Sequence, residues 1–167
     1  DNDADLDLLA AGHGPDAALI HWNDGTGRFP SLTTIYAGSY PRYIVCADLN
    51  SDGDLDLVQS NCGESYGDFF TVMLNSGSAT FPTNTDYTVS LMPQTVFAAD
   101  IDGDGDLDII TPGAGEDEVS IMLNDGSPLA GFVWWEASCA FGDTALAQSL
   151  DIYEAVPSNY RYYFGTG

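Results

Sequence analysis

Lysine is absent from the chain, and three arginines stand against 26 aspartates and glutamates, so the formal net charge is −23. A surface so poor in cations cannot neutralise a phosphate backbone, which excludes nucleic acid as a partner. An anionic membrane surface would repel the same chain.

Long apolar runs are also missing, and no segment approaches the roughly 20 residues that a membrane helix needs. We expect no membrane insertion. A basic region followed by an apolar run is absent at the N-terminus, so no signal peptide is visible. Because the chain begins inside a repeat, we expect its true N-terminus to lie upstream. Hydrophobic residues still make up 44% of the sequence, which is enough for a folded core.

Cysteine is scarce, with Cys46, Cys62 and Cys139 allowing one internal bridge at most. Cys46 lies in the apolar run YIVCAD, which predicts a small buried side chain. Cys62 and Cys139 lie in loop-like sequence, and a bridge between them is one option.

Catalytic signatures are absent as well. The two histidines are His13, in a glycine-rich loop that we expect to be exposed, and His21, in an apolar run that predicts a packed strand residue. No GxSxG motif, Cys/His pair or phosphate loop occurs. The sequence therefore predicts a protein that is not an enzyme.

What the chain has in abundance is aspartate in three related stretches. These are DNDADLD at 1–7, DLNSDGDLD at 48–56 and DIDGDGDLD at 100–108, which hold 13 of the 26 acidic residues. Carboxylates this close repel one another unless a cation joins them. Hard oxygen ligands at every second residue indicate calcium rather than zinc or copper.

The acidic stretches recur in register with other features. Asp48 and Asp100 are 52 residues apart, and each stretch is followed by an apolar run, a second apolar run ending in Asn, and a glycine turn typical of a hairpin. One repeat therefore reads as four short strands. We expect them near 42–48, 55–60, 69–75 and 85–90, and again near 94–100, 107–111, 118–124 and 131–137. The repeats span approximately 1–41, 42–93 and 94–143, with a degenerate partial repeat at 144–167.

Four-stranded antiparallel units of about 50 residues predict an all-β fold built of β-propeller blades, about three blades plus partial ends. An EF-hand would need flanking helices and a Glu at loop position 12, where this chain has Gln59 or Thr111. A sandwich would not explain the register. Three blades do not close a ring, so the chain is a fragment, completes a ring with further copies, or builds a filament by strand addition between subunits.

The stretches PRYIVCADLNSDGDLDLVQSN and PQTVFAADIDGDGDLDIITPG resemble the FG-GAP/VCBS repeat family, the calcium-loop β-propellers that include the integrin α head. The resemblance implies side-chain ligands at loop positions 1, 3, 5 and 9 and a backbone carbonyl at position 7. In the second loop these are Asp48, Asn50, Asp52, Asp56 and the carbonyl of Asp54. In the third they are Asp100, Asp102, Asp104, Asp108 and the carbonyl of Asp106.

The first loop is an incomplete copy, which implies a partial calcium site beside two complete ones. Asp1, Asp3 and Asp7 match positions 3, 5 and 9, and Asp5 matches position 7. Ala4 replaces the glycine of position 6, which is costly if the backbone there is left-handed.

Weak calcium loops suit an extracellular or cell-surface setting, because cytosolic calcium is scarce. The hypothesis that follows is a calcium-stabilised propeller serving as a non-catalytic binding or adhesion module for a protein or glycan. Alternatives are a filament subunit, a lectin, or the accessory propeller of a secreted polysaccharide-active enzyme. Trp134 and Trp135 suit either sugar stacking or packing between blades.

Overall fold

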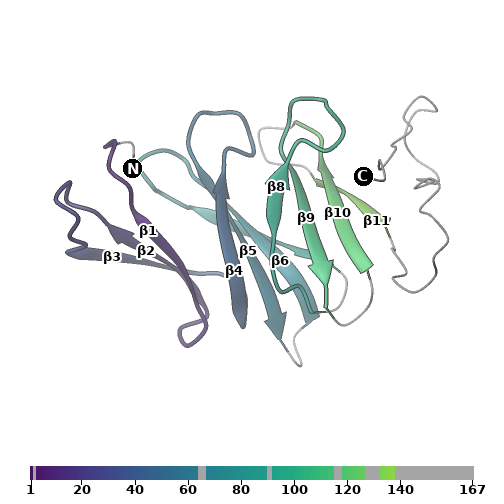
Figure 1. Ribbon diagram of the computed structural model, residues 1–167, viewed down its shortest axis with the longest axis horizontal. Helices are drawn as coiled ribbons and strands as arrows, with labels where there is room; N and C mark the ends of the chain where they lie inside the picture. Colours follow the sequence, from purple (N-terminus) through teal and green to yellow (C-terminus); the bar gives the residue numbers. More distant parts are fainter. Residues whose placement is uncertain (2, 64–66, 90–91, 115–117, 127–131, 138–167) are drawn as a thin grey trace, which may run out of the picture.

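The computed structural model describes all residues except 2, 64–66, 90–91, 115–117, 127–131 and 138–167 (Figure 1). The described part contains eleven strands and no helix. The strands are β1 (Leu8–Gly12), β2 (Ala17–Trp22), β3 (Ser31–Tyr36), β4 (Pro41–Ala47), β5 (Asp56–Gly63), β6 (Gly67–Leu74), β7 (Thr83–Thr88), β8 (Phe97–Ala99), β9 (Asp108–Gly113), β10 (Glu118–Asn124) and β11 (Phe132–Ala137).

The strands form three antiparallel sheets that follow one another along the chain. Their orders are β1-β2-β3, β4-β5-β6-β7 and β8-β9-β10-β11. The all-β prediction is confirmed, and the second and third sheets each have the four strands expected of a propeller blade. The first sheet has three strands among the described residues. In Figure 1 the β4–β5 and β8–β9 connections, which carry two acidic loops, lie at the same end of the molecule.

Strand boundaries agree with the sequence pattern except at β8. A strand was expected over 94–100, but the structure pairs only Phe97–Ala99 with β9, preceded by an isolated bridge between Pro93 and Gly113. Between the bridge and β8, the carbonyl of Thr95 accepts a hydrogen bond from the Thr111 hydroxyl at 2.8 Å. The partial repeat at 144–167 and the residue Cys139, with its suggested bridge, lie outside the described residues.

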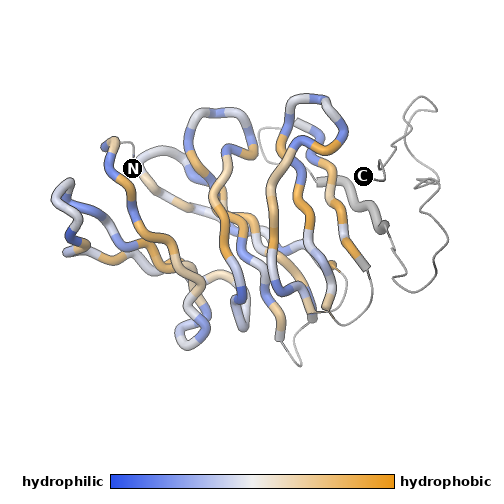
Figure 2. Tube along the Cα trace, viewed as in Figure 1, coloured by the Kyte–Doolittle hydropathy of each residue, from blue (hydrophilic) through white to orange (hydrophobic). Residues whose placement is uncertain are grey.

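The core lies between neighbouring sheets, in two clusters. Along β5, Leu57 belongs to the cluster shared with the first sheet and Val58 to the cluster shared with the third. Successive strand residues point to opposite faces, so β5 is buried on both. Figure 2 shows apolar segments along the strands and hydrophilic ones in the loops at their ends. The clusters comprise Ala18, Ile20, Ala37, Leu57 and Met73 on one side, and Ala47, Leu49, Val58, Phe70, Val72, Val89, Val96, Ile109 and Met122 on the other.

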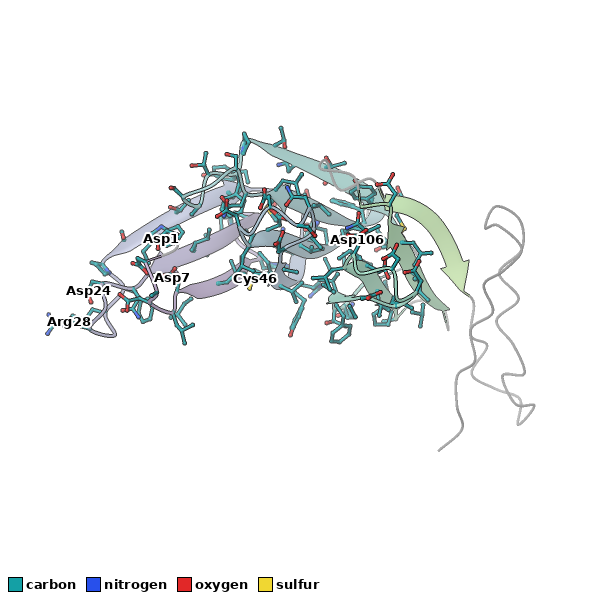
Figure 3. All side chains as sticks on the ribbon, turned by 90° about the horizontal axis from the view of Figure 1, so that it is seen from above. Asp1, Asp7, Asp24, Arg28, Cys46 and Asp106 are labelled. Atoms are coloured by element: carbon teal, nitrogen blue, oxygen red, sulfur yellow. The ribbon has the colours of Figure 1, made fainter. Side chains whose placement is uncertain are left out.

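The prediction that Cys46 is buried is wrong, because its side chain is exposed (Figure 3). On β4 it shares a face with Ile44, and the described first sheet covers Ile44 but not Cys46. Cys62, expected in a loop, instead lies in β5 and is buried.

A buried polar network ties the second sheet to the segment that leads into it. The Gln59 side-chain amide donates to the carbonyl of Ala37 and, at 2.9 Å, to Asn61 Oδ1. Asn61 in turn donates to Thr71 Oγ1 at 2.9 Å. Gly38 has φ +71°, and a Cβ there would collide with the Asn61 amide. Glycine is therefore required at this junction by conformation and by space.

We predict that Gly38→Ala destabilises the fold more than Gly27→Ala. Gly27 also has positive φ, +81°, but no atom lies within 4 Å of its Cβ position. Both variants incur the left-handed penalty of about 1–2 kcal/mol. Gly38→Ala adds displacement of a buried amide, about 1–3 kcal/mol more. Urea unfolding measures both, and equal losses would contradict the packing argument.

Candidate metal centre

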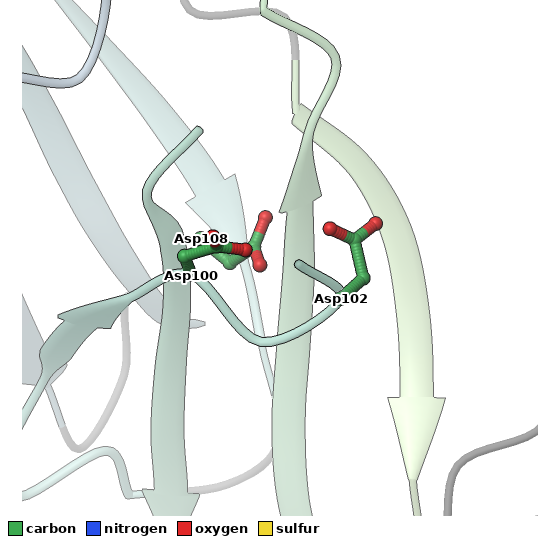
Figure 4. Close-up of side chains that lie close together, drawn as sticks. All are labelled: Asp100, Asp102 and Asp108. Carbon is green, nitrogen blue, oxygen red and sulfur yellow. The ribbon is translucent and has the colours of Figure 1, made fainter. Parts of the chain in front are cut away.

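The third loop brings three carboxylates together. One oxygen each from Asp100, Asp102 and Asp108 lies within 4.8 Å of the others (Figure 4). Two ligands of one calcium ion, each 2.3–2.6 Å from it, are at most about 5 Å apart. The donor set is made of hard oxygens only, so these residues fit a single calcium ion. In the described part of the chain, this is the one such cluster of acidic, histidine and cysteine side chains.

Backbone amides organise the same loop. Asp100 accepts hydrogen bonds from the N–H groups of Gly103, at 2.7 Å, and Gly105, at 3.3 Å. Asp104 accepts from Asp106 N at 3.0 Å. Gly103 and Gly105 both have positive φ, +80° and +101°, which glycine adopts without strain. The loop can therefore wrap around its first carboxylate. Asp104, a predicted ligand, does not belong to the three-carboxylate cluster.

The second loop has similar internal bonds, but its first aspartate accepts from position 5 where that of the third loop accepts from position 4. Asp48 accepts from Asp52 N at 3.1 Å and from Gly53 N at 3.0 Å, and Asp52 accepts from Asp54 N at 2.9 Å. Its fourth position is Ser51, which holds φ +58° where the third loop has glycine. The side-chain amide of Asn50, a predicted ligand, donates to Asp52 Oδ2 at 2.9 Å, so the side chains of these two predicted ligands lie next to each other.

The first loop keeps part of the pattern. Asp3 N donates to Asp1 Oδ1 at 3.2 Å, and Asp5 N donates to Asp3 Oδ1 at 2.9 Å. Ala4 has φ +72°, so the left-handed conformation considered from the sequence is present and carries its cost. The loop is strained at the position where the other two have glycine.

The aspartate at position 7 of each loop points toward a hairpin turn. In each repeat its carboxylate is the nearest group to the position of a Cβ on the turn glycine, and that Cβ would collide with the carboxylate at Gly25 and Gly126 but make an ordinary contact at Gly77. The pairs are Asp5 with Gly25, Asp54 with Gly77 and Asp106 with Gly126. The role of the position-7 carbonyls as ligands stays a prediction.

The last aspartate of each loop joins the loop to the neighbouring hairpin. Asp108 Oδ2 accepts from Ile101 N at 2.8 Å, and Asp108 Oδ1 accepts from Asn124 N at 2.9 Å. Asp56 accepts in the same way from Leu49 N and Asn75 N, at 2.9 and 2.7 Å. In the first repeat Asp7 accepts from Asn23 N at 2.8 Å.

These asparagines were not predicted as part of the site. Their side chains hold the loop and the turn together, each donating to the carbonyl of the leucine before the loop's last aspartate and accepting from the turn glycine's N–H. The bonds join Asn23 to Leu6 and Gly25, Asn75 to Leu55 and Gly77, and Asn124 to Leu107 and Gly126. The recurring Asn before each glycine turn was the sequence signal, and it was interpreted as turn chemistry alone.

Asn124 also reaches the preceding repeat. Its side-chain amide donates to the carbonyl of Leu49, in the second loop, at 2.6 Å. Leu49 is buried in the core cluster between the second and third sheets. The second loop is therefore held by the turn of the third sheet as well as by its own.

Burial changes the pKa values of three aspartates in the second and third loops. Asp56 and Asp108 are fully buried, and loss of hydration raises the pKa of both carboxyl groups against the opposing effect of their amide bonds. Loss of hydration also raises the pKa of Asp102. Each oxygen of Asp108 accepts one amide and keeps a second lone pair for a cation. A bound divalent ion would supply the missing countercharge.

The three antiparallel sheets and their acidic loops define a repeat protein of the β-propeller type. The family model for the FG-GAP-like repeat matches residues 1–58 and 62–111, and the chain belongs to this family. No curated protein matches the chain, and no solved structure does. In the described residues no helix is long and apolar enough to cross a membrane.

We predict that Asp102→Ala weakens calcium binding at the third loop at least about tenfold, since the charge and number of carboxylate ligands set calcium affinity. The matched control is Asp24→Ala. Both aspartates accept a hydrogen bond from the N–H two residues later, but Asp24 lies in the hairpin of the first sheet. Titration calorimetry measures both, and equal weakening would contradict the assignment.

The raised pKa values of Asp56 and Asp108 predict opposite pH dependences with and without calcium. In calcium-free protein, each raised pKa makes the protonated carboxyl group favour the folded state. This contribution to the free energy of unfolding is complete below the pKa of the unfolded chain and is lost as the pH rises through the higher pKa of the folded protein. Calcium binds the deprotonated groups, so acid weakens its binding. The melting temperatures in calcium and in chelator should therefore converge as pH falls from neutral. A constant difference would contradict this linkage.

Proposed function

We propose that this protein is an extracellular, calcium-stabilised propeller segment that acts as a non-catalytic binding or adhesion module. The observation that carries the proposal is the position of the last carboxylate in each loop. Asp56 and Asp108 are buried and bonded both to their own loop and to a hairpin. A cation beside them would hold a blade together rather than meet a substrate.

The histidines favour binding over catalysis. His13 is exposed in the β1–β2 turn, where its ring meets Tyr40 edge to face at 5.2 Å. In Figure 1 this turn lies at the end of the sheets opposite the β4–β5 connection. His21 is half-buried within β2. Neither histidine belongs to the carboxylate cluster of the third loop.

Calcium availability supports an extracellular location. Loops of exposed aspartates on short connections are typical of modules that bind calcium at the high concentrations found outside cells. A chain with a net charge of −23 also gains from divalent cations, which relieve repulsion among carboxylates.

Calcium should raise the melting temperature, and chelation should lower it. Each loop saturated at a hundred times its dissociation constant adds about 2.7 kcal/mol. For a domain of this size, each kcal/mol corresponds to about 2–4 °C. Differential scanning calorimetry with calcium, magnesium and chelator measures the shift, and magnesium should give a smaller one because it needs stricter octahedral geometry. An unchanged melting temperature in chelator would refute the proposed function.

A further inference from the structure

The second sheet is covered on both faces, whereas the first and third sheets are covered on one face each in the described part of the chain. In Figure 1 the second sheet lies between the other two, and the two core clusters fill the interfaces on its two sides. We call the face of a sheet that points toward the preceding sheet its leading face, and the opposite face its trailing face. The leading face of the first sheet and the trailing face of the third sheet are therefore the two outer faces.

The leading face of the first sheet is apolar and exposed. Leu8 follows the last aspartate of its loop, as Leu57 and Ile109 do in the other two repeats. Leu57 and Ile109 are 4% and 0% exposed, because each packs in a core cluster against the preceding sheet, but Leu8 is 53% exposed. His21 and Leu32 lie in the same cross-strand row as Leu8, and Leu32 is 52% exposed. The three strands of this sheet contain no acidic residue and no arginine, so the face has the composition of an interface.

The trailing face of the third sheet is the matching half. Ile110 and Ile121 pair across β9 and β10 as Val58 and Val72 pair across β5 and β6. Val58 and Val72 are 0% and 3% exposed because the third sheet covers them, whereas Ile110 and Ile121 are only half-buried. Phe97, which lies beside Ile110 on β8, is 50% exposed. The described chain therefore carries both halves of the interface that it forms twice internally.

A hydrogen bond crosses the interface between the second and third sheets, and equivalent groups lie at the two outer sheets. Asn124 donates to the carbonyl of Leu49, the second residue of the second loop. Asn23 is the equivalent donor in the first sheet. Among the described residues its side-chain amide donates only to the carbonyl of Leu6, so it keeps a second N–H. Ile101 is equivalent to Leu49, since each donates its N–H to the last aspartate of its loop.

We propose that the leading face of the first sheet binds the trailing face of the third sheet in a second copy of this chain. The contact is head to tail, so it builds a ring or an open array of copies. It joins copies of the chain and therefore goes beyond the function proposed above. Burial of apolar side chains favours the contact, while the net charge of −23 on each copy opposes it. Calcium in the loops, which hold 13 of the 26 acidic residues, would reduce this repulsion.

Two other contacts between copies compete with this one. Two leading faces packed on each other would bury Leu8 and Leu32 but leave the trailing face of the third sheet uncovered. A strand added at the edge of β3 would pair backbone groups and leave both apolar faces uncovered. The head-to-tail contact covers both faces, and it places Asn23 of one copy where Ile101 of the other can accept its free N–H.

The test is sedimentation of the calcium-loaded chain over a concentration series. The wild type should form species larger than a monomer. Leu32→Asp on the leading face and Phe97→Asp on the trailing face should each weaken association at least about tenfold, because each would bury a charge in an apolar contact. The control is Leu55→Asp, which makes the same charge change at a leucine that is 56% exposed in the second loop. It should associate as the wild type does.

Thermal melting should show that the three variants stay folded, since all three side chains are exposed. Leu8→Asp is the second variant of the leading face if Leu32→Asp unfolds. Salt should strengthen the association, because it screens the repulsion between two acidic chains. Weaker association at high salt would indicate a contact held by ion pairs and would contradict the apolar interface.

A mixture of the two face variants separates the head-to-tail contact from its competitors. Leu32→Asp keeps a normal trailing face and Phe97→Asp keeps a normal leading face, so the mixture should form dimers although neither variant associates alone. In a contact between two leading faces, Phe97→Asp would associate alone. In pairing at the β3 edge, both variants would associate as the wild type does. Either result, a wild type that stays monomeric, or equal weakening by Leu55→Asp would overturn the proposal.

Discussion

The repeats depend on one interaction, a buried carboxylate that accepts a backbone amide on each side. Asp108 is bonded to Ile101 within its own loop and to Asn124 at the start of the next turn, and Asp56 repeats the arrangement. A charge without exposure to water is stable only when it is well hydrogen-bonded and paired. The amides supply the first condition, and the cluster around Asp100 and Asp102 offers the place for a cation that supplies the second.

The architecture was accessible from the sequence because its signals are local and repeated. Short β-branched runs bounded by Asn-Asp-Gly or Asn-Ser-Gly turns indicate strands, and a repeat length of about 50 residues groups these strands in fours. The glycines at 53 and 105 could be assigned to a left-handed bend for the same reason, since only a few residue types adopt it without cost. The strand at β8 was predicted too long because the apolar run indicates an extended segment but not which of its residues pair with β9.

The exposure of some side chains and the contacts between distant segments depend on how neighbouring sheets pack, and the local sequence pattern does not show this packing. Cys46 lies in an apolar run yet is exposed, because coverage of the β4 face stops at Ile44. The roles of Asn23, Asn75 and Asn124 require a bond across 16 to 19 residues, which a turn motif does not reveal. A groove lined by residues 33–36 of β3 and by residues 79–84 is formed by segments of different repeats, so it appears only when the sheets are placed side by side.

The bond from Asn124 to Leu49 makes the repeats a chain of nearest neighbours rather than independent units. Through this bond the turn of the third sheet contacts the second loop. The stability of such an array is approximately the sum of the stabilities of the single repeats and of the interfaces between neighbouring repeats. An ion in the third loop would stiffen the turn that clamps the second, so that filling one loop prepares its neighbour. The effect of calcium at the third loop would then extend to the second sheet, beyond the sheet that carries the ligands.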